Sequence, residues 1–149
     1  EIYGDVWDHF YTVFEYANGV KLHSSCRQWL GCDGIVNDFI VGTKGRVDVQ
    51  NHNITGEKAW RHRKERGEID NMYQNEHDEL FAAIRKNEAI NNGDYMCKST
   101  MMAVMARMSG YTGKVVTWKQ AMESNLDLSP KAYDWNSAPQ IKLATPGRA

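Results

Sequence analysis

Two alternating runs of residues on either side of a turn constrain the fold of this chain more than any other feature. Residues 9–16 and 20–28 alternate between apolar and polar side chains, and Ala17-Asn18-Gly19 separates the two runs. Alternation of this kind is typical of strands with one buried face, and an Asn-Gly pair between two such runs is a strong hairpin signal. The sequence therefore predicts a β-hairpin.

The length of the hairpin loop decides which side chains share a face. A three-residue loop with a left-handed glycine at Gly19 places Phe14 opposite Leu22, so that one face becomes mostly apolar. A two-residue Asn-Gly loop would instead place Phe14 opposite His23 and mix the two faces. We therefore expect the longer loop.

Further short strands and a loop are expected next. Residues 35–41 and 46–49 have the composition of strands, and the glycine-flanked turn 42–45 joins them. The polar segment 51–68 contains a run of charged residues without interleaved aromatic residues after Trp60. Because charge runs of this kind usually form a solvated surface, we expect a loop over this segment.

Three helices are predicted in the second half of the chain. Capping-box spacings place helix starts at Asn71 and Thr117, and a third start lies near Asn92. A short edge strand is expected at 115–116, before the last helix. The first helix carries a stripe of side chains at helical period, formed by Tyr73, His77, Leu80, Phe81 and Ile84.

Strands followed by helices, without regular alternation, predict an α+β fold. We expect a largely antiparallel sheet with helices packed on one face and the other face open for oligomerisation. We interpret residues 1–149 as a single domain whose last part, 126–149, is an extended tail with three prolines. Side chains on the open face suit a subunit interface, and they are Tyr11, Val13, His23 and Arg27.

Composition excludes several classes of function. The formal net charge is −1, which gives no strong field for nucleic acid or an anionic membrane. No stretch approaches the roughly 20 apolar residues that span a bilayer. Three cysteines without a Cys-x-x-Cys pair indicate neither a metal site nor a disulfide framework. We expect buried reduced thiols, although Cys26 and Cys32 could pair if the loop between them turned back.

Motifs for nucleotides and common catalysts are not found. No Gly-x-Gly-x-x-Gly follows a strand, and there is no Walker loop, Gly-x-Ser-x-Gly elbow or His-Glu-x-x-His pair. We therefore expect this chain by itself to bind no nicotinamide cofactor.

Four segments, taken in order, resemble a known family. They are GTKG (42–45), YQNEHD running on to LFAAIR (73–85), NNG (91–93) and RMSGYTGKVVTW (107–118). This order resembles the C-terminal domain of Gfo/Idh/MocA oxidoreductases, over about Asp8 to Leu128. Cys26-Arg27-Gln28 and the segment 126–130 resemble secreted or sugar-associated bacterial members.

The resemblance implies a substrate-binding and oligomerisation domain of an NAD(P)-dependent sugar or cyclitol dehydrogenase. Family members carry NAD or NADP on a Rossmann domain that lies upstream, together with a catalytic lysine, so this part alone would be inactive. The implied reaction is reversible hydride transfer between nicotinamide and a carbinol carbon. The alternatives are a domain of an NAD-dependent glycosidase of the same family, and a stand-alone carbohydrate-binding or structural module. The resemblance is compatible with both a cytoplasmic and a periplasmic location.

The family's catalytic motifs do not carry over to this chain. Glu57-Lys58-Ala59 lacks the proline of the family's Glu-Lys-Pro segment, and the Asp5 to His9 spacing enters a strand where the family has a helix. We therefore assign no catalytic residue here, and the chain is expected to complete a substrate pocket.

Four residues are predicted to bind the substrate. Asn71 and Tyr73 lie at a helix start, where polar groups sit beside unpaired backbone amides that suit sugar hydroxyls. Arg27 could reach the same region from its strand end, and His77 would support Tyr73. The alternative is that Asn71 only caps the helix while Tyr73 and His77 pack against neighbours.

Overall fold

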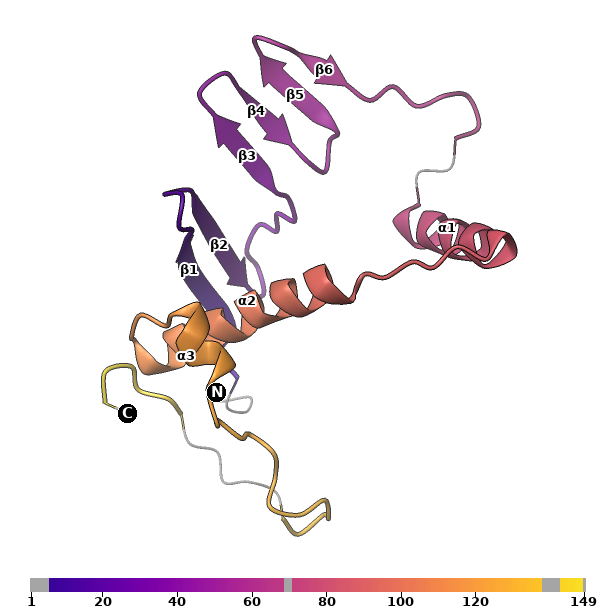
Figure 1. Ribbon diagram of the computed structural model, residues 1–149. Helices are drawn as coiled ribbons and strands as arrows, with labels where there is room; N and C mark the ends of the chain where they lie inside the picture. Colours follow the sequence, from indigo (N-terminus) through magenta and orange to yellow (C-terminus); the bar gives the residue numbers. More distant parts are fainter. Residues whose placement is uncertain (1–5, 69–70, 138–142, 149) are drawn as a thin grey trace. The chain divides into compact units, whose positions relative to one another are not determined.

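The computed structural model describes residues 6–68, 71–137 and 143–148. The described chain contains two antiparallel sheets and three helices, which confirms the α+β class (Figure 1). Contacts divide the chain into two compact units. The first unit comprises Glu1–Leu30 and Asn91–Ala149, and the second comprises Gly31–Ile90.

The first unit contains the predicted hairpin. Strands β1 (His9–Glu15) and β2 (Lys21–Arg27) are antiparallel, and Phe14 lies opposite Leu22. Gly19 has a φ of 83°, a left-handed conformation that favours glycine. The three-residue loop is therefore confirmed, because one loop length alone produces this register.

Helix α2 (Gly93–Thr112) packs against β1 within the same unit. A glycine allows the close approach: a Cβ built on Gly110 would lie 2.7 Å from the Phe10 ring. Short helix α3 (Trp118–Met122) follows, and both halves of the predicted capping box at Thr117 are present. The helix boundaries expected from the capping signals are thus confirmed.

The expected edge strand at 115–116 is wrong. These two residues have no strand geometry, and Val115 is exposed. The chain must reverse between α2 and α3 within a few residues, and the Thr117 amide is already bonded to the Gln120 side chain. Extended residues without a neighbouring strand cannot form a ladder.

The second unit contains a four-stranded antiparallel meander. It runs in sequence order through β3 (Phe39–Gly42), β4 (Gly45–Asp48), β5 (Asn53–Gly56) and β6 (Trp60–Arg61). Strands β5 and β6 correct the expectation of a solvated loop over 51–68. Although this segment is polar, Ile54 pairs with Val47 across the ladder and supplies the β-branched packing that a strand needs.

A carboxylate organises the end of β4. Asp48 accepts hydrogen bonds from Asn37 Nδ2 at 2.9 Å and from Asn51 Nδ2 at 3.0 Å. These bonds favour the ionised form, so the Asn37 amide, followed by that of Asn51, lowers the pKa of Asp48 below its ordinary value.

The Asp48 contacts predict an acid-sensitive turn. A folded-state pKa below the unfolded value of about 3.9 gives stabilisation that is present above that pH and is lost as pH falls through the folded-state pKa. We expect Asp48→Asn to remove part of this pH dependence. Thermal melts of both proteins from pH 6 to about 2 would measure it.

Asp38→Asn is the matched control for this change. The Asp38 carboxylate lies in the same loop region and takes no hydrogen bond from the residues that the structure describes. If both substitutions changed the acid limb of the melting curve equally, the turn would not be the cause.

Helix α1 (Met72–Lys86) also belongs to the second unit. It begins and ends within one residue of the predicted positions, and Arg85 and Lys86 occupy its last turn, where cations are favourable. Ala83 is the buried residue of this helix. The predicted stripe has helical period, but its large members are exposed; they include Tyr73, Leu80, Phe81 and Ile84.

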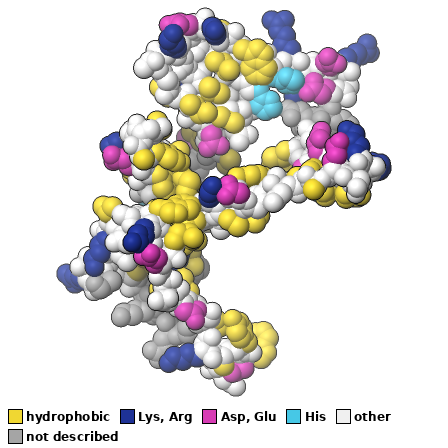
Figure 2. All heavy atoms as spheres, viewed as in Figure 1, with side chains coloured by type: hydrophobic (Ala, Val, Ile, Leu, Met, Phe, Trp, Pro, Cys, Tyr) yellow, Lys and Arg dark blue, Asp and Glu magenta, His cyan; other side chains and the backbone are white. Residues whose placement is uncertain are grey.

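The chain exposes far more surface than its mass requires. Among the described residues, Ala83 and Ala121 are the buried hydrophobic ones, and the total accessible surface is 14003 Å². Two separate compact units of this combined mass would expose about 9,300 Å² together. Figure 2 shows hydrophobic side chains on the visible surface of both the strands and the helices.

The cysteines follow the same pattern. Cys26, Cys32 and Cys97 are free thiols, as expected, but all three are exposed. The expectation of buried thiols is therefore wrong. Cys26 lies on the apolar face of β2, which has too few covering residues to bury it.

Candidate functional site

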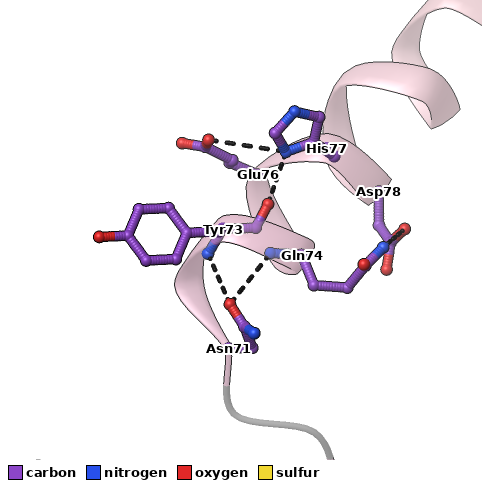
Figure 3. Close-up of polar contacts among 6 residues, drawn as sticks. All are labelled: Asn71, Tyr73, Gln74, Glu76, His77 and Asp78. Atoms are coloured by element: carbon purple, nitrogen blue, oxygen red, sulfur yellow. Dashed lines mark hydrogen bonds and ion pairs between the residues drawn. The ribbon is translucent and has the colours of Figure 1, made fainter.

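Three of the predicted substrate residues lie together at the start of α1 (Figure 3). The Asn71 side-chain oxygen accepts from the backbone amides of Tyr73 at 3.0 Å and Gln74 at 3.3 Å. Asn71 therefore caps the helix. Gln74 does not complete a capping box, because its side-chain amide donates to Asp78 at 2.8 Å instead.

His77 contacts Tyr73 through the backbone. Its Nδ1 lies 2.6 Å from the Tyr73 carbonyl oxygen and 3.6 Å from a Glu76 carboxylate oxygen. Since a carbonyl only accepts, Nδ1 donates this hydrogen bond. The Tyr73 phenol points away from the imidazole in Figure 3, and the residue is 65 % exposed.

Arg27 occupies a different part of the chain. It ends β2, opposite His9, and belongs to the first unit, whereas Asn71, Tyr73 and His77 belong to the second. The structure thus groups three of the four predicted residues, and a role for any of them in binding remains a prediction.

The first unit contains an aromatic cluster that was not predicted from the sequence. The Trp7 and Tyr111 rings stack with centroids 4.8 Å apart, and the Phe10 centroid lies 5.8 Å from Trp7 and 5.9 Å from Tyr111. The Arg107 guanidinium lies over the Tyr111 ring at 4.3 Å, close enough for a cation–π interaction. The Trp7 amide donates to the Tyr111 hydroxyl at 3.0 Å. We call these four residues the aromatic cluster.

The aromatic cluster borders a groove between the hairpin and α2. The groove has a volume of about 460 Å³. Its lining is mainly apolar and also includes Thr12, Ser24 and Ser99. Apolar clefts with a few polar groups are typical of small-molecule sites, and aromatic rings suit the C–H faces of a sugar ring.

A weak local signal for this cluster exists in the sequence. Arg107 and Tyr111 are four residues apart on α2, so they lie on one helix face. Their approach to Trp7 spans 104 positions of the chain, which periodicity cannot predict.

Metal binding and membrane insertion receive no support from the described part of the chain. No group of three histidine, cysteine or acidic side chains there could hold a metal ion. None of the described helices has the length and apolar character needed to cross a bilayer.

Comparison with known proteins identifies no relative. No family model, curated protein or solved structure matches the chain.

Proposed function

We propose that this chain is the substrate-binding and oligomerisation domain of an NAD(P)-dependent sugar or cyclitol dehydrogenase. The aromatic cluster beside its groove is the observation that carries the proposal. Arg107 and Tyr111 belong to the segment 107–118, which is part of the resemblance to Gfo/Idh/MocA oxidoreductases. The same segment therefore supplies both the family likeness and two of the residues that line the groove.

The large exposed surface supports a role inside a bigger assembly. Hydrophobic side chains on α1 and on the hairpin are exposed in the described part of the chain. Exposed apolar surface is unfavourable in water, and a partner protein that buried it would stabilise the domain. On the outer face of the hairpin, Tyr11 donates to or accepts from His23 Nδ1 at 2.7 Å, and Val13 lies opposite His23. Aromatic and mixed polar residues of this kind suit a subunit interface.

We expect no nicotinamide cofactor to bind to the described part of this chain. A pyrophosphate needs open amides at a helix start. Asn71 and Thr117 already bond the first amides of α1 and α3, and Asn91 Oδ1 bonds the Gly93 amide at the start of α2. In the proposal, the cofactor and the catalytic base belong to another part of a longer protein.

In such a protein this domain would bind and orient the sugar. Apolar side chains of the groove would contact the C–H face of the sugar, while Thr12, Ser24 and the Arg107 guanidinium would hydrogen-bond to its hydroxyl groups. By holding the reacting carbon in place for hydride transfer, the domain would increase the rate of the reaction.

The direct test is an assay of the full-length gene product with a panel of sugars and cyclitols. Net reduction of NAD or NADP by one of them would support a dehydrogenase. Sugar release without net reduction would favour the glycosidase. If the full-length protein bound neither NAD nor NADP, the result would contradict the proposal. The stand-alone carbohydrate-binding or structural module would then be the remaining alternative.

Tyr73 tests the separate prediction that the start of α1, in the second unit, contacts the sugar. We expect Tyr73→Phe to raise the KM for the sugar several-fold, because an exposed phenol that bonds the sugar is lost. The nicotinamide KM and the melting temperature should stay nearly unchanged, since the phenol makes no hydrogen bond within the described chain.

Asn71 needs a control that keeps its cap. Asn71→Ala removes two hydrogen bonds and should cost about 1 kcal/mol of stability whatever the function. Asn71→Ser retains a capping oxygen, so a rise in sugar KM in that variant isolates a contact with the sugar. Unaltered kinetics in Tyr73→Phe and Asn71→Ser together would contradict this binding site.

A further inference from the structure

Two histidines face each other at the end of the β5–β6 hairpin in the second unit. The His62 amide donates to the His52 carbonyl at 3.0 Å, which extends the β5–β6 ladder beyond its last strand pair. The two imidazole centroids lie 5.7 Å apart, and the Trp60 ring lies 6.3 Å from His62. His52 has a φ of 47°, a left-handed conformation that is uncommon for a residue with a side chain.

One carboxylate holds this arrangement in place. Glu68 Oε1 lies 2.9 Å from His62 Nε2, and Glu68 Oε2 accepts from the Glu65 amide at 2.8 Å. The side chains of His62 and Glu68 are both about one-third exposed, so the pair is partly shielded from water. His62 is therefore anchored, while His52 is exposed.

A pocket of about 560 Å³ opens beside these rings. The side chains that line it are nearly all hydrogen-bond donors or cations, namely Gln50, His52, Arg61, His62, Arg63 and Lys64. Figure 2 shows histidine side chains near Lys or Arg side chains at this end of the sheet. The charge run that the sequence analysis assigned to a solvated loop thus lines one concave surface.

We propose that this pocket binds a small phosphorylated ligand, specifically the phosphate monoester of a sugar. Guanidinium groups donate two parallel hydrogen bonds to a phosphate, and charge-assisted bonds of this kind are the strong ones. Arg61 and Arg63 supply two such groups, and the exposed His52 imidazole, which also lines the pocket, adds a further polar group. The volume lies within the range of small-molecule sites, so a sugar can follow its phosphate into the pocket.

A nucleic-acid strand fits these observations less well. The cations are confined to one hairpin end, and the whole chain has a formal net charge of −1. Strands of nucleic acid need a basic track several nucleotides long with repeated aromatic platforms. Trp60 and the two imidazoles form one short platform only within this pocket region.

The site is testable by calorimetric titration of the full chain. The probes are inorganic phosphate, glucose 6-phosphate and glucose at low salt. We expect glucose 6-phosphate to bind at least tenfold more tightly than inorganic phosphate, and glucose to give no measurable heat. The double substitution Arg61→Gln/Arg63→Gln should weaken glucose 6-phosphate binding at least tenfold.

A control with the same change of charge separates a built site from a general field. Lys44 lies in the β3–β4 turn and Lys58 in the β5–β6 turn, both in the same unit and away from the pocket lining. Lys44→Gln/Lys58→Gln should change the affinity less than twofold. Equal losses in the two double variants would overturn the proposal, as would glucose binding as tightly as glucose 6-phosphate.

Two other outcomes would also overturn it. Binding of inorganic phosphate with no gain from the sugar would reduce the site to an adventitious ion only. The pocket would be assigned to nucleic acid if the protein bound a single-stranded oligonucleotide, released it on addition of salt, and did not bind glucose 6-phosphate. Circular dichroism of each variant confirms that the fold is retained before the titrations are compared.

Discussion

Replacing Gly56 by alanine is expected to destabilise the four-stranded sheet by about 3 kcal/mol or more, because steric strain and a backbone clash act together. Gly56 has a φ of 124°, which side chains rarely adopt. A Cβ at this position would lie 2.3 Å from the Lys44 carbonyl oxygen and 2.5 Å from the Gly45 Cα. Gly45 and Gly56 are ladder partners, so the clash would push β4 away from β5.

Gly67→Ala is the control for backbone strain alone. Gly67 has a φ of 91°, and no atom lies within 4 Å of a Cβ built there. Its substitution should cost about 1 kcal/mol. Hydrogen exchange of the Val47 and Ile54 amides reports on the sheet directly, and protection should collapse in Gly56→Ala but persist in Gly67→Ala. Similar protection in both variants would show that the Gly45–Gly56 approach is not required.

Local signals explain what the sequence could predict of the fold. The hairpin register follows from a turn and from the alternation on either side of it, which involve residues close in sequence. The helix starts at Asn71 and Thr117 follow from side chains that bond amides two or three positions later. Such features need no knowledge of the rest of the chain.

Strands β5 and β6 depended on distant partners. Their surroundings in the sequence are polar, and the pairing is decided by the close approach of Gly45 and Gly56 and by the pairing of Val47 with Ile54. A charge run says nothing about which backbone lies beside it, so the segment was predicted to be a loop. For the same reason, the pocket formed by its charged residues was not predicted.

The same distinction between local and distant contacts applies to the candidate sites. Asn71, Tyr73 and His77 lie within about two turns at the start of one helix, so their proximity could be predicted from spacing. The aromatic cluster joins the start of β1 to the end of α2, and a hydrogen bond across 104 positions leaves no periodic pattern. Local spacing thus predicted which residues would lie together at the start of α1, but it could not predict the aromatic cluster, which is formed by tertiary contacts.

The aromatic cluster should be the main source of stability where the hairpin meets α2. Tyr111 stacks on Trp7, contacts Phe10 and lies under the Arg107 guanidinium. Tyr111→Ala removes all three contacts, and we expect it to destabilise the first unit by about 2 to 3 kcal/mol, less than for a fully buried aromatic residue. Urea unfolding followed by near-ultraviolet circular dichroism would measure the loss.

Two further variants divide the effect between ring and hydroxyl. Tyr111→Phe keeps the stacked ring and loses the hydrogen bond from the Trp7 amide, so it should cost only about 1 kcal/mol. A double-mutant cycle of Tyr111→Ala with Trp7→Ala should give a coupling of about 0.5 to 1.5 kcal/mol from the stacked pair. A coupling near zero would show that the rings do not stack in solution. If Tyr111→Phe lost as much stability as Tyr111→Ala, the hydroxyl rather than the ring would hold the hairpin against α2.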